Sequence, residues 1–290
     1  MRSMACRGEP MSPNFTIIRV QTTETQPFIL LPTYVNGKGP FGFVLDTGAA
    51  MSVLTKELAD AIGVKGTEVK EALGAAGQRI EVPLGRVDSI SIGKSNAENI
   101  QVGITTELPK CIGARGALGY NFLKGFVVTI DYESNLLTLA SPGDETSQAR
   151  AMQAYVPLRL AKPDRPILLV DVLVNARETY QFILDTGASQ TIVSPEMAQR
   201  MGIGGTTADS IIGVGGATPS SVGISTSLSI GEASLSNVTV IIADIFSGLS
   251  KAVGAKFDGI LGFNFLSRFK IEIDYPNERL GLLERGRSNG

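Results

Sequence analysis

Two short motifs in the chain combine a carboxylate, a hydroxyl and a glycine: Asp46-Thr47-Gly48 and Asp185-Thr186-Gly187. Each follows an apolar, strand-like run, Phe43-Val44-Leu45 in the first case and Phe182-Ile183-Leu184 in the second. A buried aspartate is costly unless it is paired or hydrogen-bonded, so an Asx turn alone explains such a matched pair poorly. Two carboxyl groups held close together share one proton and supply an acid and a base at once.

Composition excludes most other hydrolytic chemistry. The 290 residues include no histidine, so imidazole bases, Ser-His-Asp triads and histidine-ligated zinc are absent. Cys6 and Cys111 are the two cysteines, which leaves room for one disulfide bridge and for no four-thiolate metal site. We therefore expect no cofactor and no metal. The net charge is -2, and no basic block offers a surface for nucleic acid.

The beginning of the chain carries no recognisable targeting signal. Residues 1–20 lack the apolar stretch of a secretory signal, and nowhere do 18 apolar residues follow one another. We expect no membrane span and a cytoplasmic location. The alternative is a shortened or wrongly assigned start of the chain.

An internal repeat accounts for most of the sequence. The segment FGFVLDTGAAMSVL at 41–54 matches YQFILDTGASQTIV at 180–193, with an offset of 139. Further matches join SISIG to SLSIG at an offset of 138, and ALGYNFL to ILGFNFL and IDY to IDY at 143. The second copy has thus lost one residue and then gained five. The chain is a duplication of one unit of roughly 120 residues, the size of a small domain.

Turn-forming polar residues separate the two copies and define the expected domains. We predict an N-terminal extension, a first lobe, a linker, a second lobe and a tail, at residues 1–19, 20–141, 142–152, 153–285 and 286–290.

Strands are expected to dominate both lobes. Leu168, Val170, Val172 and Val174 recur at every second position as in a strand, and Asn36-Gly37 is a strong hairpin turn.

One short helix is expected in each lobe. Thr55 and Ser194 are suitable N-caps, Pro195 suits the first helical position, and Gly63 and Gly202 suit the position just past the end.

At this point the sequence resembles the aspartic peptidases, both the retropepsin-like and the two-lobed pepsin-like groups. The resemblance rests on the two Asp-Thr-Gly motifs and on Ala117-Leu118-Gly119 and Ile260-Leu261-Gly262, which match the apolar-Gly element behind each aspartate. It implies an all-β, pseudo-two-fold symmetric barrel of two lobes. It also implies flap hairpins over the site, with these residues at their tips: Gly74, Ala75, Ala76, Gly77, Gly213, Val214, Gly215 and Gly216.

The resemblance further implies an aspartic endopeptidase that is active as a monomer on a polypeptide substrate. Asp46 and Asp185 would be catalytic, activating a water between them. The residues expected to support this dyad are Thr47, Gly48, Ala49, Thr186, Gly187 and Ala188, with each threonine bonding to the opposing loop.

Two alternatives to a one-chain enzyme remain open from sequence. The chain could be a peptide-binding module of the same fold without catalysis, or its lobes could pair with lobes of another chain.

One departure from the pepsin-like pattern concerns the residue after each glycine. Ala49 and Ala188 stand where a hydroxyl commonly bonds the carboxylate, so we expect a raised dyad pKa and a less acidic optimum than in pepsin-like enzymes. Asp131 and Asp274 also repeat, but they precede turns and are expected to be surface turn residues.

Overall fold

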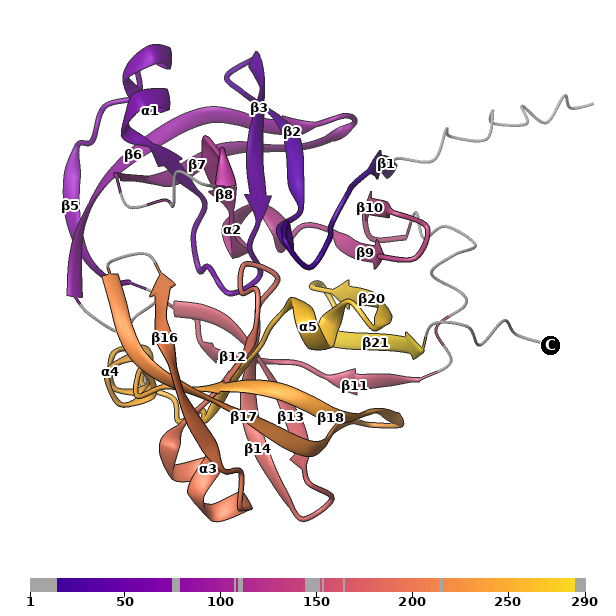
Figure 1. Ribbon diagram of the computed structural model, residues 1–290. Coiled ribbons are helices and arrows are strands. Elements are labelled where there is room, and N and C mark those ends of the chain that lie inside the picture. Colours follow the sequence, from indigo (N-terminus) through magenta and orange to yellow (C-terminus); the bar gives the residue numbers. More distant parts are fainter. Residues whose placement is uncertain are drawn as a thin grey trace, which may run out of the picture.

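The computed structural model describes residues 15–74, 79–106, 108, 112–143, 152, 154–163, 165–213 and 216–284. The fold is mostly β, as the sequence predicts, and the first half of the chain lies above the second in Figure 1. None of the helices in these ranges has the length and apolar character of a membrane-spanning segment.

The first half folds into a seven-stranded sheet in the order β2-β3-β8-β4-β7-β6-β5. A further pairing of β2 with β6 curls the sheet round on itself, because the two strands are otherwise far apart in that order. The strands are β2 (Leu30–Val35), β3 (Lys38–Leu45), β4 (Val53–Thr55), β5 (Glu68–Leu73), β6 (Arg79–Ile92), β7 (Ser95–Thr105) and β8 (Gly116–Leu118).

The second half repeats this order in an eight-stranded sheet, β12-β13-β14-β19-β15-β18-β17-β16, with β13 also pairing β17. Only β12 lacks a counterpart in the first sheet, so the duplication read from sequence is present in the topology. The strands are β12 (Arg159–Lys162), β13 (Arg165–Val174), β14 (Glu178–Leu184), β15 (Thr191–Val193), β16 (Gly205–Gly213), β17 (Gly216–Ile230), β18 (Ala233–Ile242) and β19 (Gly259–Leu261).

A third sheet joins the two halves, with three strands from each in the order β1-β10-β9-β20-β21-β11. Strand β9 of the first half pairs antiparallel with β20 of the second. Strand β1 lies in the range expected to be an N-terminal extension, yet it pairs with β10 along its length. The lobe boundaries themselves stay a prediction. The strands are β1 (Phe15–Arg19), β9 (Val127–Asp131), β10 (Leu136–Ala140), β11 (Tyr155–Pro157), β20 (Phe269–Asp274) and β21 (Arg279–Glu284).

The predicted helices form where their caps indicate. In α1 (Lys56–Ile62) the Thr55 hydroxyl accepts a hydrogen bond from the Leu58 N–H, and Gly63 closes the helix at φ 81°. In α3 (Pro195–Met201) the Ser194 hydroxyl likewise caps the N-terminus, and Gly202 closes the helix at φ 70°. Glycine suits both ends because this left-handed conformation strains other residues.

Three further helices go beyond the one per lobe that the sequence predicts. Helices α2 (Tyr120–Leu123) and α5 (Phe263–Leu266) are single turns, too short to show helical periodicity. Helix α4 (Phe246–Val253) lies in the stretch where the second copy gains five residues. It forms because Phe246, Leu249 and Val253 share one face, which packs on the sheet of the second half.

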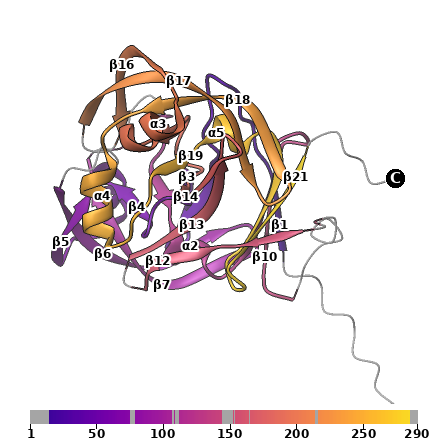
Figure 2. The same ribbon diagram turned by 90° about the horizontal axis from the view of Figure 1, so that it is seen from below.

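Hairpins form at the expected turns. Asn36 and Gly37, at φ 50° and 71°, connect β2 to β3 as a tight two-residue loop. Strands β5 and β6 form one long hairpin and β16 and β17 another, and both views show these hairpins on the same side of the molecule (Figures 1 and 2).

The hydrophobic core runs through both halves and the joining sheet. Phe122-Leu123 and Phe265-Leu266 are fully buried in it, at equivalent places in the two halves. A smaller cluster under α4 includes Ile183 and Ile260, which flank the strand end that carries Asp185. The strand that presents Asp185 is therefore packed from both faces.

Candidate active site

Each aspartate of the repeated motif lies at the end of a buried central strand. Asp46 follows β3 and its N–H donates to the Leu118 carbonyl of β8 at 3.1 Å. Asp185 follows β14 and its N–H donates to the Leu261 carbonyl of β19, also at 3.1 Å. The parallel neighbours β8 and β19 thus fix both loops in the same way, because each strand pairing continues directly into the aspartate.

The two loops interlock through their threonines. The Thr47 hydroxyl donates to the Leu184 carbonyl at 2.7 Å and accepts from the Thr186 N–H at 3.0 Å. In return, the Thr186 hydroxyl donates to the Leu45 carbonyl at 2.7 Å and accepts from the Thr47 N–H at 3.2 Å. Both hydroxyls are buried, and each donates one hydrogen bond and accepts another. A displacement of one half relative to the other at this point would break these four hydrogen bonds.

Glycine is required after each threonine because the opposing carboxylate occupies the space of a side chain. A Cβ on Gly48 would lie 2.5 Å from the Asp185 Cγ, and one on Gly187 would lie 2.9 Å from the Asp46 Cγ. Each loop therefore passes directly over the aspartate of the other half. This places Asp46 and Asp185 together at the centre of the molecule.

The two carboxyl groups form one hydrogen-bonded unit. Burial raises the pKa of Asp46 well above its usual range, and the neighbouring Asp185 charge raises it further. Burial also raises the pKa of Asp185, to about 6, while the Gly187 N–H at 2.7 Å and the hydrogen bond with Asp46 hold it lower. Both pKa values are therefore raised, and the two carboxyls titrate as a pair that shares one proton.

The raised pKa values agree in direction with the argument from Ala49 and Ala188, but their main cause differs. Burial is the largest effect at both carboxyls. The N–H groups of Ala49 and Ala188 act the other way, since each donates to the aspartate of its own loop and lowers its pKa. The alanines thus contribute backbone donors, which their side-chain type does not predict.

Asn121 holds the first loop from behind and was not singled out by the sequence argument. Its Oδ1 accepts from the N–H and the hydroxyl of Ser52 at 2.8 and 2.9 Å, and its Nδ2 donates to the Gln101 carbonyl at 2.7 Å. The Ser52 hydroxyl in turn accepts from the Gly119 N–H at 3.1 Å. One amide therefore ties α2 to β7 and to the segment leading into β4.

Asn264 repeats this arrangement in the second half. Its Oδ1 accepts from the N–H and hydroxyl of Thr191, both at 2.8 Å, and its Nδ2 donates to the Thr239 carbonyl at 2.7 Å. Asn121 and Asn264 both belong to the repeat at offset 143. Their recurrence beside buried aromatic residues was the sequence signal that could have identified them.

The flap residues lie only partly within the described ranges. Gly74 directly follows β5, and Gly213 and Gly216 are facing residues at the end of the β16–β17 hairpin. Ala75, Ala76, Gly77, Val214 and Gly215 lie outside the described residues. The hairpins are present, and the contacts of their tips with substrate stay a prediction.

Asp131 and Asp274 are turn residues, but Asp274 does not lie at the surface as expected. Asp131 accepts from the N–H groups of Glu133 and Ser134. Asp274 is completely buried, accepts from the Asn277 N–H and side chain, and pairs with Arg279 at 2.7 Å. The guanidinium group and the amide satisfy this buried charge, which makes its burial tolerable.

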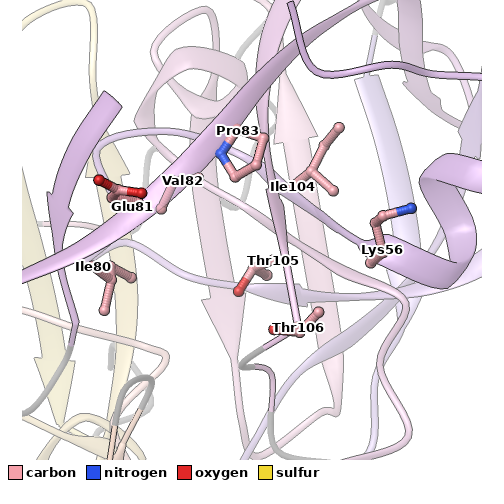
Figure 3. A pocket seen from close by; sticks show the side chains of 8 residues that line it. All are labelled: Lys56, Ile80, Glu81, Val82, Pro83, Ile104, Thr105 and Thr106. Carbon is pink, nitrogen blue, oxygen red and sulfur yellow. The ribbon is translucent and has the colours of Figure 1, made fainter. Parts of the chain in front are cut away.

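A cavity of about 410 Å³ lies beside the β5–β6 hairpin, and neither Asp46 nor Asp185 is among the residues that line it (Figure 3). Its walls come from β6, the end of β7 and the start of α1, and its lining combines four apolar residues with Lys56, Glu81 and two threonines. Within the part of the chain that the structure describes, no group of three or more Cys, Asp or Glu side chains is placed to hold a metal ion.

The chain resembles known proteins at the level of a family and of solved structures. No curated protein matches the chain. The chain is similar to a retropepsin-like aspartic protease from Rickettsia conorii, with 25% identity over 45% of this chain and 94% of that one and a TM-score of 0.35. The aspartyl protease family matches residues 31–122 and 170–265, one segment around each Asp-Thr-Gly motif and together more than half of the chain. The chain belongs to the aspartyl protease family.

Proposed function

We propose that this protein is an aspartic endopeptidase in which Asp46 and Asp185 of one chain activate a single water molecule. The observation that carries the proposal is the contact of the two carboxyl groups, each overlaid by the glycine of the other loop. Family membership supports the same reaction class and a polypeptide substrate.

In the proposed reaction, the ionised Asp185 accepts a proton from the water as its oxygen bonds to the carbonyl carbon of the scissile peptide. The protonated Asp46 donates a hydrogen bond to the carbonyl oxygen, where negative charge develops. The tetrahedral intermediate then expels the amine, which takes the proton back from Asp185 as the carbon–nitrogen bond breaks, so that Asp185 is ionised again. Water is the nucleophile, so no covalent enzyme intermediate forms and no histidine is required.

The substrate is proposed to bind as an extended strand between the hairpins β5–β6 and β16–β17. A strand-like segment offers backbone donors and acceptors to such hairpins, and its side chains then alternate in direction. The two hairpins lie on the same side of the molecule, as this arrangement requires (Figure 2).

The interlocked threonines favour a site within one chain. Thr47 and Thr186 already use each other's loops, and the strands β9 and β20 join the same two halves. Pairing of each lobe with another chain would break these contacts. This observation supports a monomeric enzyme over the intermolecular alternative.

A peptide-library cleavage assay, run with and without pepstatin, tests the proposed function. We expect cleavage that pepstatin blocks, at a rate per molecule independent of protein concentration. Asp185→Asn is the matched control, because it keeps the shape of the side chain but cannot serve as the base. Pepstatin-insensitive cleavage, or binding of peptides without any cleavage by the wild type, would refute it.

A further inference from the structure

The hydroxyl of Tyr275 is a buried polar group that the proposed mechanism does not use. Tyr275 follows β20 and is 5% exposed. Among the buried side-chain oxygen and nitrogen atoms of the described residues, its Oη is the one with no hydrogen-bond partner. Buried hydroxyls almost always have a partner in protein or ordered water, so this group calls for an explanation.

Tyr275 lies beneath the Asp46 loop. Its ring packs edge to face on Tyr120, with 5.9 Å between the ring centres. The Tyr120 N–H donates to the Ala49 carbonyl at 2.8 Å, and the Ala49 N–H reaches back to the Asp46 carbonyl at 3.4 Å. A tyrosine of the second half thus supports the catalytic loop of the first.

The two halves differ in the aromatic residues that pack beneath the aspartate loops. The hydrogen bonds of the loops match, since the Phe263 N–H donates to the Ala188 carbonyl at 2.8 Å, as the Tyr120 N–H does to Ala49. In the aromatic layer, Tyr120 corresponds to Phe263 and Tyr275 to Tyr132, whose ring lies 5.7 Å from that of Phe263. Within the described part of the chain, an unpartnered buried hydroxyl therefore lies under Asp46 and not under Asp185.

We propose that Tyr275 is a positioning residue for Asp46, with its hydroxyl donating toward the Asp46 carboxyl through an ordered water. The proposal rests on the function proposed above, and it concerns a group that acts on one aspartate of the pair. Two titratable groups act on the Tyr275 hydroxyl, Asp46 and Tyr120, and Glu278 acts in turn on Tyr120.

The expected effect has a definite sign. Burial and the Asp46 charge raise the pKa of Tyr275, so its hydroxyl stays protonated and acts as a donor. A donor stabilises the ionised form of Asp46 and lowers its pKa. Because the proposed mechanism leaves the proton of the pair on Asp46, removing the donor shifts the alkaline limb of the pH-rate profile upward, by about half a unit. The acid limb of the coupled pair, on which Asp185 ionises in the proposed mechanism, moves less.

Tyr275→Phe tests this proposal, and Tyr132→Phe is the matched control in the other half. Carbon-13 NMR of aspartate-labelled protein, assigned with Asp46→Asn, follows the carboxyl titrations whether or not peptides are cleaved. The melting temperature of each variant is measured alongside, together with the pH dependence of kcat/KM.

We expect Tyr275→Phe to raise the pKa of Asp46 and to move the alkaline limb to higher pH, without raising the melting temperature. Tyr132→Phe should change neither the pKa of Asp46 nor the position of the alkaline limb. The proposal would be overturned if Tyr275→Phe raised the melting temperature and left the Asp46 titration unchanged. That result would mean that the Tyr275 hydroxyl bonds to nothing in the folded protein. Equal shifts in both variants would also overturn it. If the wild type cleaves no peptide, the proposed function fails, and the NMR titration still decides the role of Tyr275.

Discussion

Thr129 and Glu272 occupy the same position in the two halves of the chain, and they face each other directly across β9 and β20. The local two-fold axis of the duplication therefore passes between them. In a symmetric ancestor one residue would have faced its own copy, which for glutamate would bring two charges together. Here the Thr129 hydroxyl donates to Glu272 at 3.5 Å, and the Tyr155 hydroxyl donates to it at 2.5 Å.

The buried Glu272 predicts a pH-dependent stability. Burial raises its pKa, and the Asp274 charge adds to this effect against the Tyr155 hydrogen bond. A carboxyl with a raised folded-state pKa stabilises the fold at low pH, and this contribution is lost as the pH rises through that value. Glu272→Gln should therefore raise the melting temperature at pH 7 by about 2–4 °C, the effect of roughly 1 kcal/mol in a protein of this size. Thermal unfolding at pH 4 and pH 7 measures it, and a variant less stable at pH 7 would contradict it.

The threonine network predicts a stability loss of equal size in the two halves. Thr47→Val removes the hydroxyl that bonds the Leu184 carbonyl and the Thr186 N–H, leaving two buried backbone groups without their partner. We expect a loss of about 2 kcal/mol or more in the free energy of unfolding, because each unsatisfied group costs roughly 1–3 kcal/mol. Thr186→Val should cost a similar amount. Urea unfolding measures both, and Thr47→Ser, which keeps the hydroxyl, should be close to wild type. A valine variant as stable as the serine control would contradict the prediction.

Gly48→Ala should reduce catalysis through the opposing aspartate. The added methyl group would fall on the Asp185 carboxyl, which must move from its partner. We expect kcat to fall by roughly 100-fold, as for a misplacement of about 1 Å at a reacting group. Gly125→Ala is the control, since nothing lies within 4 Å of a Cβ there. Steady-state kinetics of both proteins give the comparison, and unaltered kcat in Gly48→Ala would show that the carboxyls need not touch.

The dyad predicts a bell-shaped pH-rate profile with an optimum above pH 6. Burial raises the pKa of Asp185 to about 6, so its charge, needed to accept a proton from water, is lost below that pH. The pKa of Asp46 is also raised, so its proton is lost only at higher pH. Both limbs of the pH-rate profile report the titration of the coupled pair, not of one carboxyl alone. Measuring kcat/KM from pH 3 to pH 9 checks the shape, and an optimum at strongly acid pH would contradict it.

Sequence alone predicted the parts of the fold that repeat or that follow local rules. The resemblance to aspartic peptidases is confirmed by the family match, and the two sheets repeat the same strand order. The caps of α1 and α3 were predictable because Thr55, Ser194, Gly63 and Gly202 act on their own neighbours in the chain. The two Asp-Thr-Gly motifs could be recognised because the duplication placed the same three residues at equivalent positions in both halves.

Contacts between distant segments could not be predicted in the same way. Asp274 appeared to be a surface residue because its turn is local, whereas its burial depends on the sheet shared by both halves. The backbone donors at Ala49 and Ala188 depend on loop geometry rather than on side-chain type. The hydroxyl of Tyr275 becomes notable only once its surroundings are known to offer it no partner.

Mixing two inactive variants tests most directly whether one chain supplies both aspartates to a single site. Asp46→Asn and Asp185→Asn are each expected to fold like the wild type and to lose at least a thousandfold in kcat, since neither retains the acid–base pair. An equimolar mixture should stay equally inactive, because each molecule holds its two halves together. Full peptidase activity in either single variant, or recovery of activity in the mixture, would contradict the account.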